Sequence, residues 1–154
     1  MNSVTDRLNE LGLILPAATA PLANYVPWVR SGTMVYISGQ VSRNHVGTVM
    51  VGILGESMMT EQGAMGAQTC ALALIAQMAA AVDGDWTRII RVVKINGFVA
   101  SHASFREQPI VINGASDLLV AVLSDAGRHA RSAVGVASLP LGAAVEIDAI
   151  IEVR

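Results

Sequence analysis

The sequence predicts an α+β fold in which one mixed β-sheet carries two helices on the same face. Residues 145–153 alternate apolar and polar side chains, which is typical of a strand with one buried face. Residues 60–82 and a second stretch ending at Gly127 repeat small and apolar residues every three or four positions, as amphipathic helices do. Strand-type segments alternate with these helices, and a strand reached through a helical crossover pairs in parallel with the strand before it.

A short helix and three strands are expected in the first part of the chain. Residues 3–11 predict the helix, and Gly12 ends it. Residues 1–20 are expected to be an N-terminal extension of a single domain that covers residues 1–154. Residues 25–30, 34–38 and 46–53 contain β-branched and aromatic residues and predict strands, with turns between them.

The two long helices are predicted together with their ends. Thr60 is expected to cap the first helix, because its hydroxyl can accept from the free amides of the first turn. Asp83 and Gly84 are expected to end that helix near Val82. The small residues of its inner stripe allow close approach to a sheet; the stripe consists of Ala64, Ala67, Ala71, Leu74, Ile75, Met78 and Val82. A β-branched strand at 88–100 follows, and the second helix begins between residues 109 and 113.

The C-terminal segment places two charged residues in apolar surroundings. Arg131 opens one apolar strand, and Glu146 lies on the polar face of the strand at 145–153. Between these strands, Pro140 lacks an amide donor and Gly142 permits a positive φ, so we expect a turn that pairs the strands. Such pairing would let Arg131 and Glu146 share one cleft.

Composition limits the classes of function. The chain is 53% hydrophobic and 14% charged, with a mean hydropathy of +0.52, so we expect a partner or a membrane to cover some apolar surface. The longest nearly apolar run, residues 70–82, is shorter than the ~20 residues of a membrane span, which favours a partner. A net charge of −2 argues against general nucleic-acid binding, which uses a basic surface.

The chain is expected to be cytoplasmic. The apolar run at residues 11–20 is preceded by Asp6 and Glu10 and interrupted by Pro16, unlike a secretory signal peptide. The single cysteine, Cys70, cannot form an internal disulfide, which agrees with a reducing compartment. Its position in an Ala-rich helix predicts a core residue.

Arg131 and Glu146 are the candidates for chemistry, because the usual catalytic motifs are missing from the sequence and its three histidines lack metal-ligand spacing. A guanidinium holds a carboxylate through two charge-assisted hydrogen bonds, so Arg131 suits an acidic ligand. The alternative is an ion pair with Asp148 or Glu152. A carboxylate beside an apolar cleft can activate water, so Glu146 suits hydrolysis. The alternative is a solvated residue on the polar face of its strand.

The pattern Arg-Ser-x-Val-x-Val-x-x-Leu-Pro-x-x-x-x-Val-Glu-Ile at 131–147 resembles the C-terminal signature of the Rid family, the reactive intermediate deaminases also called YjgF or L-PSP proteins. The segments Asn24-Tyr25-Val26 and Ile37-Ser38-Gly39-Gln40 are similar to the N-terminal half of that family. The resemblance covers residues 21–153 and is closest to a longer branch with an N-terminal extension. It implies the same α+β fold, with three subunits packed sheet to sheet as a barrel-like homotrimer.

The resemblance also implies the residues of a binding site. Arg131 matches the arginine that holds the substrate carboxylate, Tyr25 matches a tyrosine that closes the pocket, and Ser38 and Gly39 match a strand end that lines it. Asn113 aligns with a polar position near the arginine. At three positions the chain departs from better-known members, which often have cysteine, glutamate and an aromatic residue there; these are Ala133, Gly135 and Ser116. We expect Ala133 to line a pocket that these departures reshape.

The activity implied by the resemblance is hydrolytic deamination of enamine and imine acids, of the 2-aminoacrylate and 2-iminopropionate kind, to 2-keto acids and ammonia. Arg131 would anchor the carboxylate and Glu146 would position water. No cofactor is implied, because the imine is already electrophilic. The alternative is a module that binds small keto acids in the same intersubunit pocket without turnover. Ribonuclease activity ranks third, because the sequence lacks the basic surface and the paired acid and base that RNA cleavage is expected to use.

Overall fold

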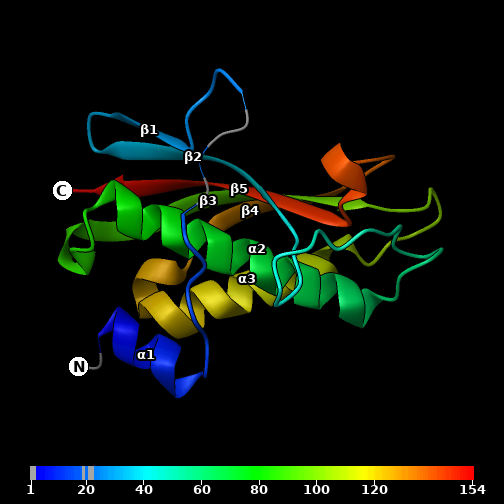
Figure 1. Ribbon diagram of the computed structural model, residues 1–154, viewed down its shortest axis with the longest axis horizontal. Coiled ribbons are helices and arrows are strands. Elements are labelled where there is room, and N and C mark those ends of the chain that lie inside the picture. The colour runs from blue at the N-terminus through cyan, green and yellow to red at the C-terminus, as the bar shows by residue number, and fades with distance from the viewer. Residues whose placement is uncertain (1–2, 19, 21–22) are drawn as a thin grey trace.

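The protein is described here by a computed structural model that covers residues 3–18, 20 and 23–154. Residues 1–2 and 19 of the predicted extension, and the start of the family resemblance at residue 21, lie outside the described residues. A five-stranded sheet forms one layer, two long helices form the next, and a short helix lies on the outside (Figure 1). The helices are α1 (Val4–Glu10), α2 (Thr60–Ala81) and α3 (Gln108–Leu123), and the strands are β1 (Trp28–Ser31), β2 (Met34–Val41), β3 (Ile89–Ala100), β4 (Ala130–Val136) and β5 (Val145–Val153).

The strand order is β1-β2-β5-β3-β4, and of the strand pairs among the described residues only β3 and β4 are parallel. The predicted mixed sheet with both long helices on one face is therefore confirmed (Figure 1). The predicted pairing of the two C-terminal strands is wrong. The α3 crossover returns β4 to the outer edge of β3, and β5 bonds to β2 and β3 in the middle of the sheet. The turn at Pro140–Gly142 thus carries the chain past β3.

The alternation along β5 determines which side of the sheet is covered. Every second side chain is apolar and buried beneath the helices; these are Val145, Ile147, Ala149, Ile151 and Val153. Glu146, Asp148 and Glu152 lie on the opposite face, which we call the open face, and are only half-buried. The open face also exposes apolar side chains, including Tyr36 at 45%. One side of the sheet is therefore core, and the other is a partly apolar surface.

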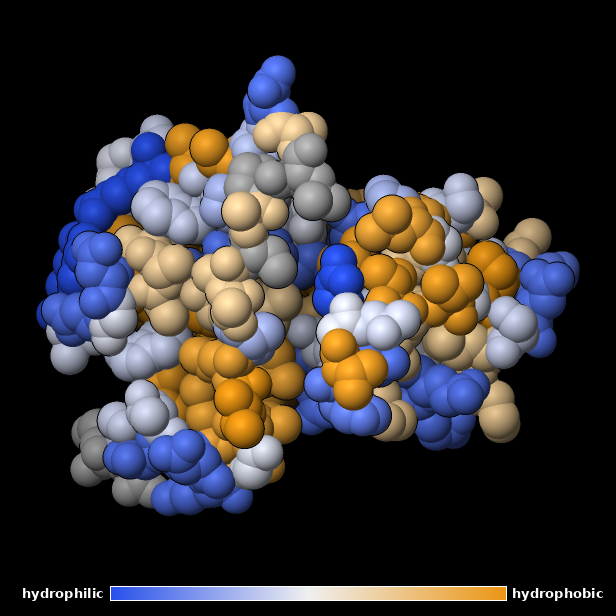
Figure 2. Space-filling model, viewed as in Figure 1, coloured by the Kyte–Doolittle hydropathy of each residue, from blue (hydrophilic) through white to orange (hydrophobic). Residues whose placement is uncertain are grey.

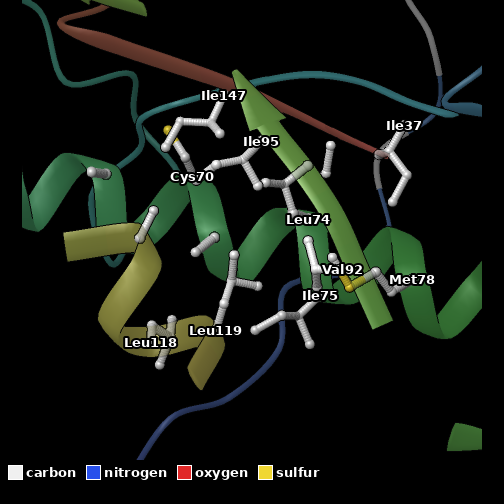
Figure 3. Packing of buried hydrophobic residues seen from close by; sticks show 14 of the residues in the cluster. Ile37, Cys70, Leu74, Ile75, Met78, Val92, Ile95, Leu118, Leu119 and Ile147 are labelled. Carbon is white, nitrogen blue, oxygen red and sulfur yellow. The ribbon is translucent and has the colours of Figure 1, made fainter. Parts of the chain in front are cut away.

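Small residues let α2 pack closely on the sheet as well as on α3. Gly63, Gly66, Ala67, Cys70 and Ala71 are buried along α2. The Cys70 thiol lies at the base of this layer, 3.6 Å from the carbonyl oxygen of Val145, and burial raises its pKa. Figure 3 shows side chains of α2, α3 and the sheet meeting around Leu74 and Ile95. The prediction that Cys70 is a core residue is confirmed.

The start of α2 differs from the prediction. Met59 precedes the helix, and the side-chain carbonyl of Gln62 accepts from its amide at 2.8 Å. Thr60 is the first helical residue, and its hydroxyl donates to Glu107 at 2.7 Å. Thr60 therefore links the starts of α2 and α3 and does not cap α2.

Two predicted strands are also corrected. Residues 46–53 form only isolated bridges, and the Asn44 side chain accepts from the amides of Val46 and Thr48, which folds residues 44–48 into a turn. Gly47 adopts a φ of 86°, which permits that turn. The strand predicted at 25–30 begins only at Trp28, after Pro27, which lacks an amide donor. Tyr25 consequently lies outside the sheet.

The N-terminal extension packs on the helix layer. Ser3 and Asp6 form a capping box at the start of α1, and Gly12 follows the helix with a φ of 66°. Val4 and Leu8 are buried, and Arg7 donates to the carbonyl of Val122 at 2.7 Å. Figure 2 shows hydrophobic side chains gathered between the α1 region and the helices above it.

Two helical segments, residues 60–81 and 108–127, have the length and the apolar composition of a membrane-spanning helix. The apolar run at residues 70–82, on which the sequence prediction rested, is only part of the first hydrophobic stretch. In this fold, 56% of the most apolar part of the first segment and 44% of that of the second are buried inside the protein, where they contribute to the core. The absence of a membrane span stays a prediction.

Candidate functional site

The predicted site residues fall into two clusters on opposite faces of the sheet. Gly97 pairs with Ala133, and a Cβ on Gly97 would meet the side chain of Ile112 in α3, so Ala133 and Arg131 also point toward α3. Glu146 pairs with Phe98, the next residue of β3, and therefore points to the open face. The first group consists of Asn113, Arg131 and Ala133, and we call it, together with the neighbouring Ser116 and His129, the edge cluster. We call the second the sheet-face cluster, consisting of Tyr25, Ser38, Gly39 and Glu146.

Arg131 is held against α3 at two points. Its Nη1 donates to the hydroxyl of Ser116 at 3.1 Å, and its Nη2 donates to the carbonyl of Pro109 at 3.2 Å. The ion pair considered as an alternative is not formed, since Asp148 is on the open face and accepts from Asn96 at 2.7 Å. Two of the five guanidinium N–H groups thus bond to the described residues, and three remain for a ligand.

His129 extends the support of Arg131. Its Nδ1 lies 2.6 Å from the carbonyl oxygen of Gly127, and because a carbonyl only accepts, Nδ1 carries the proton. In the neutral ring Nε2 is then an acceptor, and the Ser116 hydroxyl donates to it at 3.0 Å. Burial lowers the pKa of His129 and the positive charge of Arg131 adds to that effect, although the Gly127 carbonyl opposes it. The neutral form is therefore favoured.

Asn113 and Ala133 complete the edge cluster. Asn113 is exposed and lies four residues after Pro109 and three before Ser116, which places it on the same face of α3 as the two contacts of Arg131. Ala133 is half-buried two residues after Arg131 on the same side of β4, where it packs against the core. A small side chain there leaves room beside the guanidinium.

Glu146 and Gly39 are in direct contact in the sheet-face cluster. A Cβ added to Gly39 would lie 3.0 Å from the carboxyl carbon of Glu146 and closer still to Oε1, so glycine makes room for the carboxylate. Glu146 is half-buried, and desolvation followed by the negative charge of Asp148 raises its pKa. A carboxylate with a raised pKa is suited to exchanging protons near neutral pH.

Ser38 brings Tyr25 toward the same strand end. The Ser38 hydroxyl donates to the carbonyl of Val26 at 2.8 Å, and its amide donates to the carbonyl of Pro27 at 2.9 Å. These bonds hold the segment that carries Tyr25 beside the bulged end of β2, between Ile37 and Gln40. Tyr25 is 53% exposed, so it packs only loosely on its own chain.

The single chain thus does not unite Arg131 with Glu146. Two hollows among the described residues lie elsewhere, one of about 490 Å³ between the N-terminal segment and the helices and one of about 350 Å³ near Ser101 and Gln108. Neither is lined by a residue of the predicted site. The described residues hold no group of three or more metal-ligating side chains.

Sequence reasoning missed the roles of Ser116 and His129. Ser116 was noted only as a departure, and His129 only as a histidine without a metal-ligand partner. The residues lie 13 positions apart, and α3 and β4 bring them together. The available signal was the proximity of His129 to Arg131 in the sequence, since they are two residues apart.

Comparisons with known proteins agree with the fold and with the resemblance. The family model for endoribonuclease L-PSP matches residues 16–153. Protein TCP17 of Trypanosoma cruzi is 52% identical over 152 residues, which are 98% of this chain and 94% of that protein. A 2-iminobutanoate/2-iminopropanoate deaminase of Dermatophagoides farinae is 29% identical over 139 residues, 90% of this chain and 93% of that enzyme.

Solved structures show the same architecture. A protein of unknown function from Agrobacterium tumefaciens is 48% identical and superposes with a TM-score of 0.91, covering 98% of this chain and 92% of that one. A Shewanella oneidensis protein provisionally described as an endoribonuclease is 31% identical with a TM-score of 0.93, covering 99% and 100%. With matches of this extent and identity, the chain belongs to the endoribonuclease L-PSP family, the family of Rid and YjgF proteins that its sequence resembles.

Proposed function

We propose that the protein is a hydrolytic deaminase of small imine and enamine acids, acting at a site shared between neighbouring subunits. The observation that carries the proposal is the state of the two charged residues. Arg131 is fixed against α3 with three N–H groups available, and Glu146 is half-buried with a raised pKa. The first suits a carboxylate, and the second suits proton exchange with water. The similarity to an iminobutanoate deaminase supports this reading.

The chemistry requires one carboxylate to move two protons. In the proposed reaction the substrate carboxylate binds Arg131, and Glu146 accepts a proton from a water whose oxygen attacks the imine carbon. The C–N π electrons move to nitrogen, which takes that proton back from Glu146, and the result is a tetrahedral amino alcohol. Glu146 then accepts the hydroxyl proton of this intermediate and donates it to the amine as the C–N bond breaks, so the products are a 2-keto acid and ammonia.

A second subunit is the proposed means of bringing the two clusters together. The edge cluster lies beside the outermost strand β4, and the sheet-face cluster lies on the open face. Sheet-to-sheet packing of identical chains could place the edge of one chain over the open face of the next. The exposed apolar residues Val29, Tyr36 and Val134 would be covered by such packing. We therefore propose a cyclic homotrimer, with Tyr25 closing the pocket across the interface.

A binding module without turnover is the second candidate, because one specific observation favours it. The edge cluster is complete within one chain, so Arg131 can hold a carboxylate whether or not Glu146 approaches it. The changes at Ala133, Gly135 and Ser116 could leave such a pocket able to bind a keto acid while misplacing the imine carbon by the ~1 Å that is enough to impair chemistry.

An assay with 2-aminoacrylate, generated in place by a dehydratase, separates the two candidates. We expect the wild-type protein to hydrolyse the derived imine faster than buffer does, and Glu146→Gln to lower turnover about 100-fold while leaving keto-acid binding in place. Glutamine keeps the size and a hydrogen bond but removes the negative charge. Robust keto-acid binding with hydrolysis no faster than in buffer would support the binding module and reject the deaminase.

A further inference from the structure

The edge cluster contains a directed chain of hydrogen bonds that no motif explains. Arg131 donates to Ser116 at 3.1 Å, Ser116 donates to Nε2 of His129 at 3.0 Å, and Nδ1 of His129 donates to the Gly127 carbonyl at 2.6 Å. Each side chain in this chain is half-buried. The direction is fixed from one end, because the Gly127 carbonyl can only accept. The tautomer of His129 therefore determines where the Ser116 hydroxyl points.

We propose that Ser116 and His129 are positioning residues for Arg131 and that they couple the binding of an acidic ligand to the uptake of one proton by His129. This inference rests on the proposed role of Arg131 as the carboxylate anchor. When His129 is neutral, the Ser116 hydroxyl donates its proton to Nε2 of His129. The Ser116 oxygen accepts from Arg131 through one of its lone pairs. The guanidinium is then held at Ser116 and at Pro109, so its remaining N–H groups face a ligand in one orientation.

Protonation of His129 reverses one link of the chain. An imidazolium has two donors, so Nε2–H donates to Ser116, and the hydroxyl proton is released to point toward a ligand. A second positive charge then lies two hydrogen bonds from the guanidinium. A bound carboxylate near Arg131 favours that charge, and by linkage the ligand promotes proton uptake.

The surroundings of His129 make this coupling local. Arg131 on β4 is the charged group that acts on the ring, and it disfavours the imidazolium until an anion neutralises it. Asp125, in the 3-10 helix after α3, and Arg128, which follows that helix, form an exposed ion pair with each other at 3.4 Å. Asp117, next to Ser116 on α3, is also exposed. A carboxylate on Arg131 is thus the change that most directly favours protonation of His129.

The test measures 2-oxobutanoate binding by calorimetry between about pH 7.5 and pH 5, in two buffers with different ionisation enthalpies. All proteins carry Glu146→Gln, because Glu146 also titrates above its ordinary range and would confound the profile. In this background we expect affinity to rise at least threefold as the pH falls, with proton uptake on binding. His129→Gln keeps an acceptor for Ser116 but cannot be charged. It should bind about equally at pH 7.5 and lose the increase in acid.

His129→Leu and Ser116→Ala remove the link itself and should weaken binding about tenfold at every pH, the scale of one hydrogen bond. His45→Leu, at an exposed histidine outside the cluster, is the matched control and should leave the profile unchanged. Thermal melts of each variant exclude loss of folding. If the background protein binds the keto acid but the three cluster variants share its affinity and pH profile, the inference is overturned. The wild-type protein is titrated at pH 7.5 as a reference outside the pH series, and if it binds no keto acid, it is the proposed function that fails.

Discussion

Replacing Gly39 with alanine is expected to displace the Glu146 carboxylate while the protein stays folded. The added Cβ would lie 3.0 Å from the carboxyl carbon and 3.2 Å from Cγ of Glu146, whereas nonbonded carbons rest at about 3.5–4.0 Å. Oε1 would be closer still, so the carboxylate must move by about 1 Å. The backbone of Gly39 lies outside the left-handed region, so alanine adopts it without strain.

The expected effect follows from that displacement. A shift of about 1 Å in a catalytic group can lower the rate about 100-fold, which corresponds to ~2.7 kcal/mol in the activation free energy. The side chain that moves is the free end of a flexible glutamate, so the free energy of unfolding should change by less than about 1 kcal/mol. Keto-acid binding through Arg131 should be retained.

A double-mutant cycle tests whether the effect acts through Glu146. The kcat of imine hydrolysis is measured for the wild type, Gly39→Ala, Glu146→Gln and the double variant. If alanine acts by moving the carboxylate, it should lower kcat in the wild-type background and have little further effect once Glu146 is glutamine. Equal losses in both backgrounds, or no loss in either, would refute the reasoning.

Four other outcomes are expected. Arg131→Ala should abolish measurable keto-acid binding by calorimetry and leave the melting temperature unchanged, since a ligand of about six heavy atoms has few other contacts. If the variant binds the keto acid as well as the wild type does, the arginine has a structural role only. The kcat/KM of imine hydrolysis should increase with pH as Glu146 loses its proton, because the base acts in its ionised form, and the midpoint of that increase should lie above the ordinary glutamate pKa of 4.5. A kcat/KM profile without this increase would exclude Glu146 as the base. Light scattering at micromolar concentration should give three times the 16.1 kDa chain mass, and a monomer would reject the shared site. Gly114→Ala should reduce the free energy of unfolding in urea by about 1–3 kcal/mol, because the added Cβ would meet the backbone of Ala64. An unchanged midpoint of urea unfolding would show that α2 and α3 can move apart at this contact without cost.

Local periodicity predicted most of the elements of this fold. The alternation at 145–153 and the three- and four-residue repeats at 60–82 are properties of neighbouring residues, and they depend only on which face is buried. The same holds for the capped N-terminal helix and for the β-branched strand at 88–100. Predictions failed where side chains compete with the backbone. The Asn44 side chain folds residues 44–48 into a turn, and the Thr60 hydroxyl donates to Glu107 and does not cap α2.

The candidate site was predicted as a set of residues but not as an arrangement. Arg131 and Glu146 stood out because they are charged and lie in apolar strands, and the family pattern added Tyr25, Ser38, Gly39, Asn113 and Ala133. The expectation that one hairpin would bring the two charges into a cleft was wrong, because β3 lies between β4 and β5. A residue's place in a strand predicts its neighbours along the chain, whereas strand order is set by the packing of the whole sheet.

The sequence by itself determined the α+β class, the two amphipathic helices and the buried face of β5, because these depend on spacing along the chain. Only the tertiary structure decided that Arg131 points to α3 while Glu146 points to the open face, because this depends on hydrogen-bond register between strands far apart in sequence. It also decided the Ser116–His129 contact, which forms because the α3 crossover lays β4 beside the helix it has just left. Contacts between distant residues are a consequence of packing, and no local pattern encodes them.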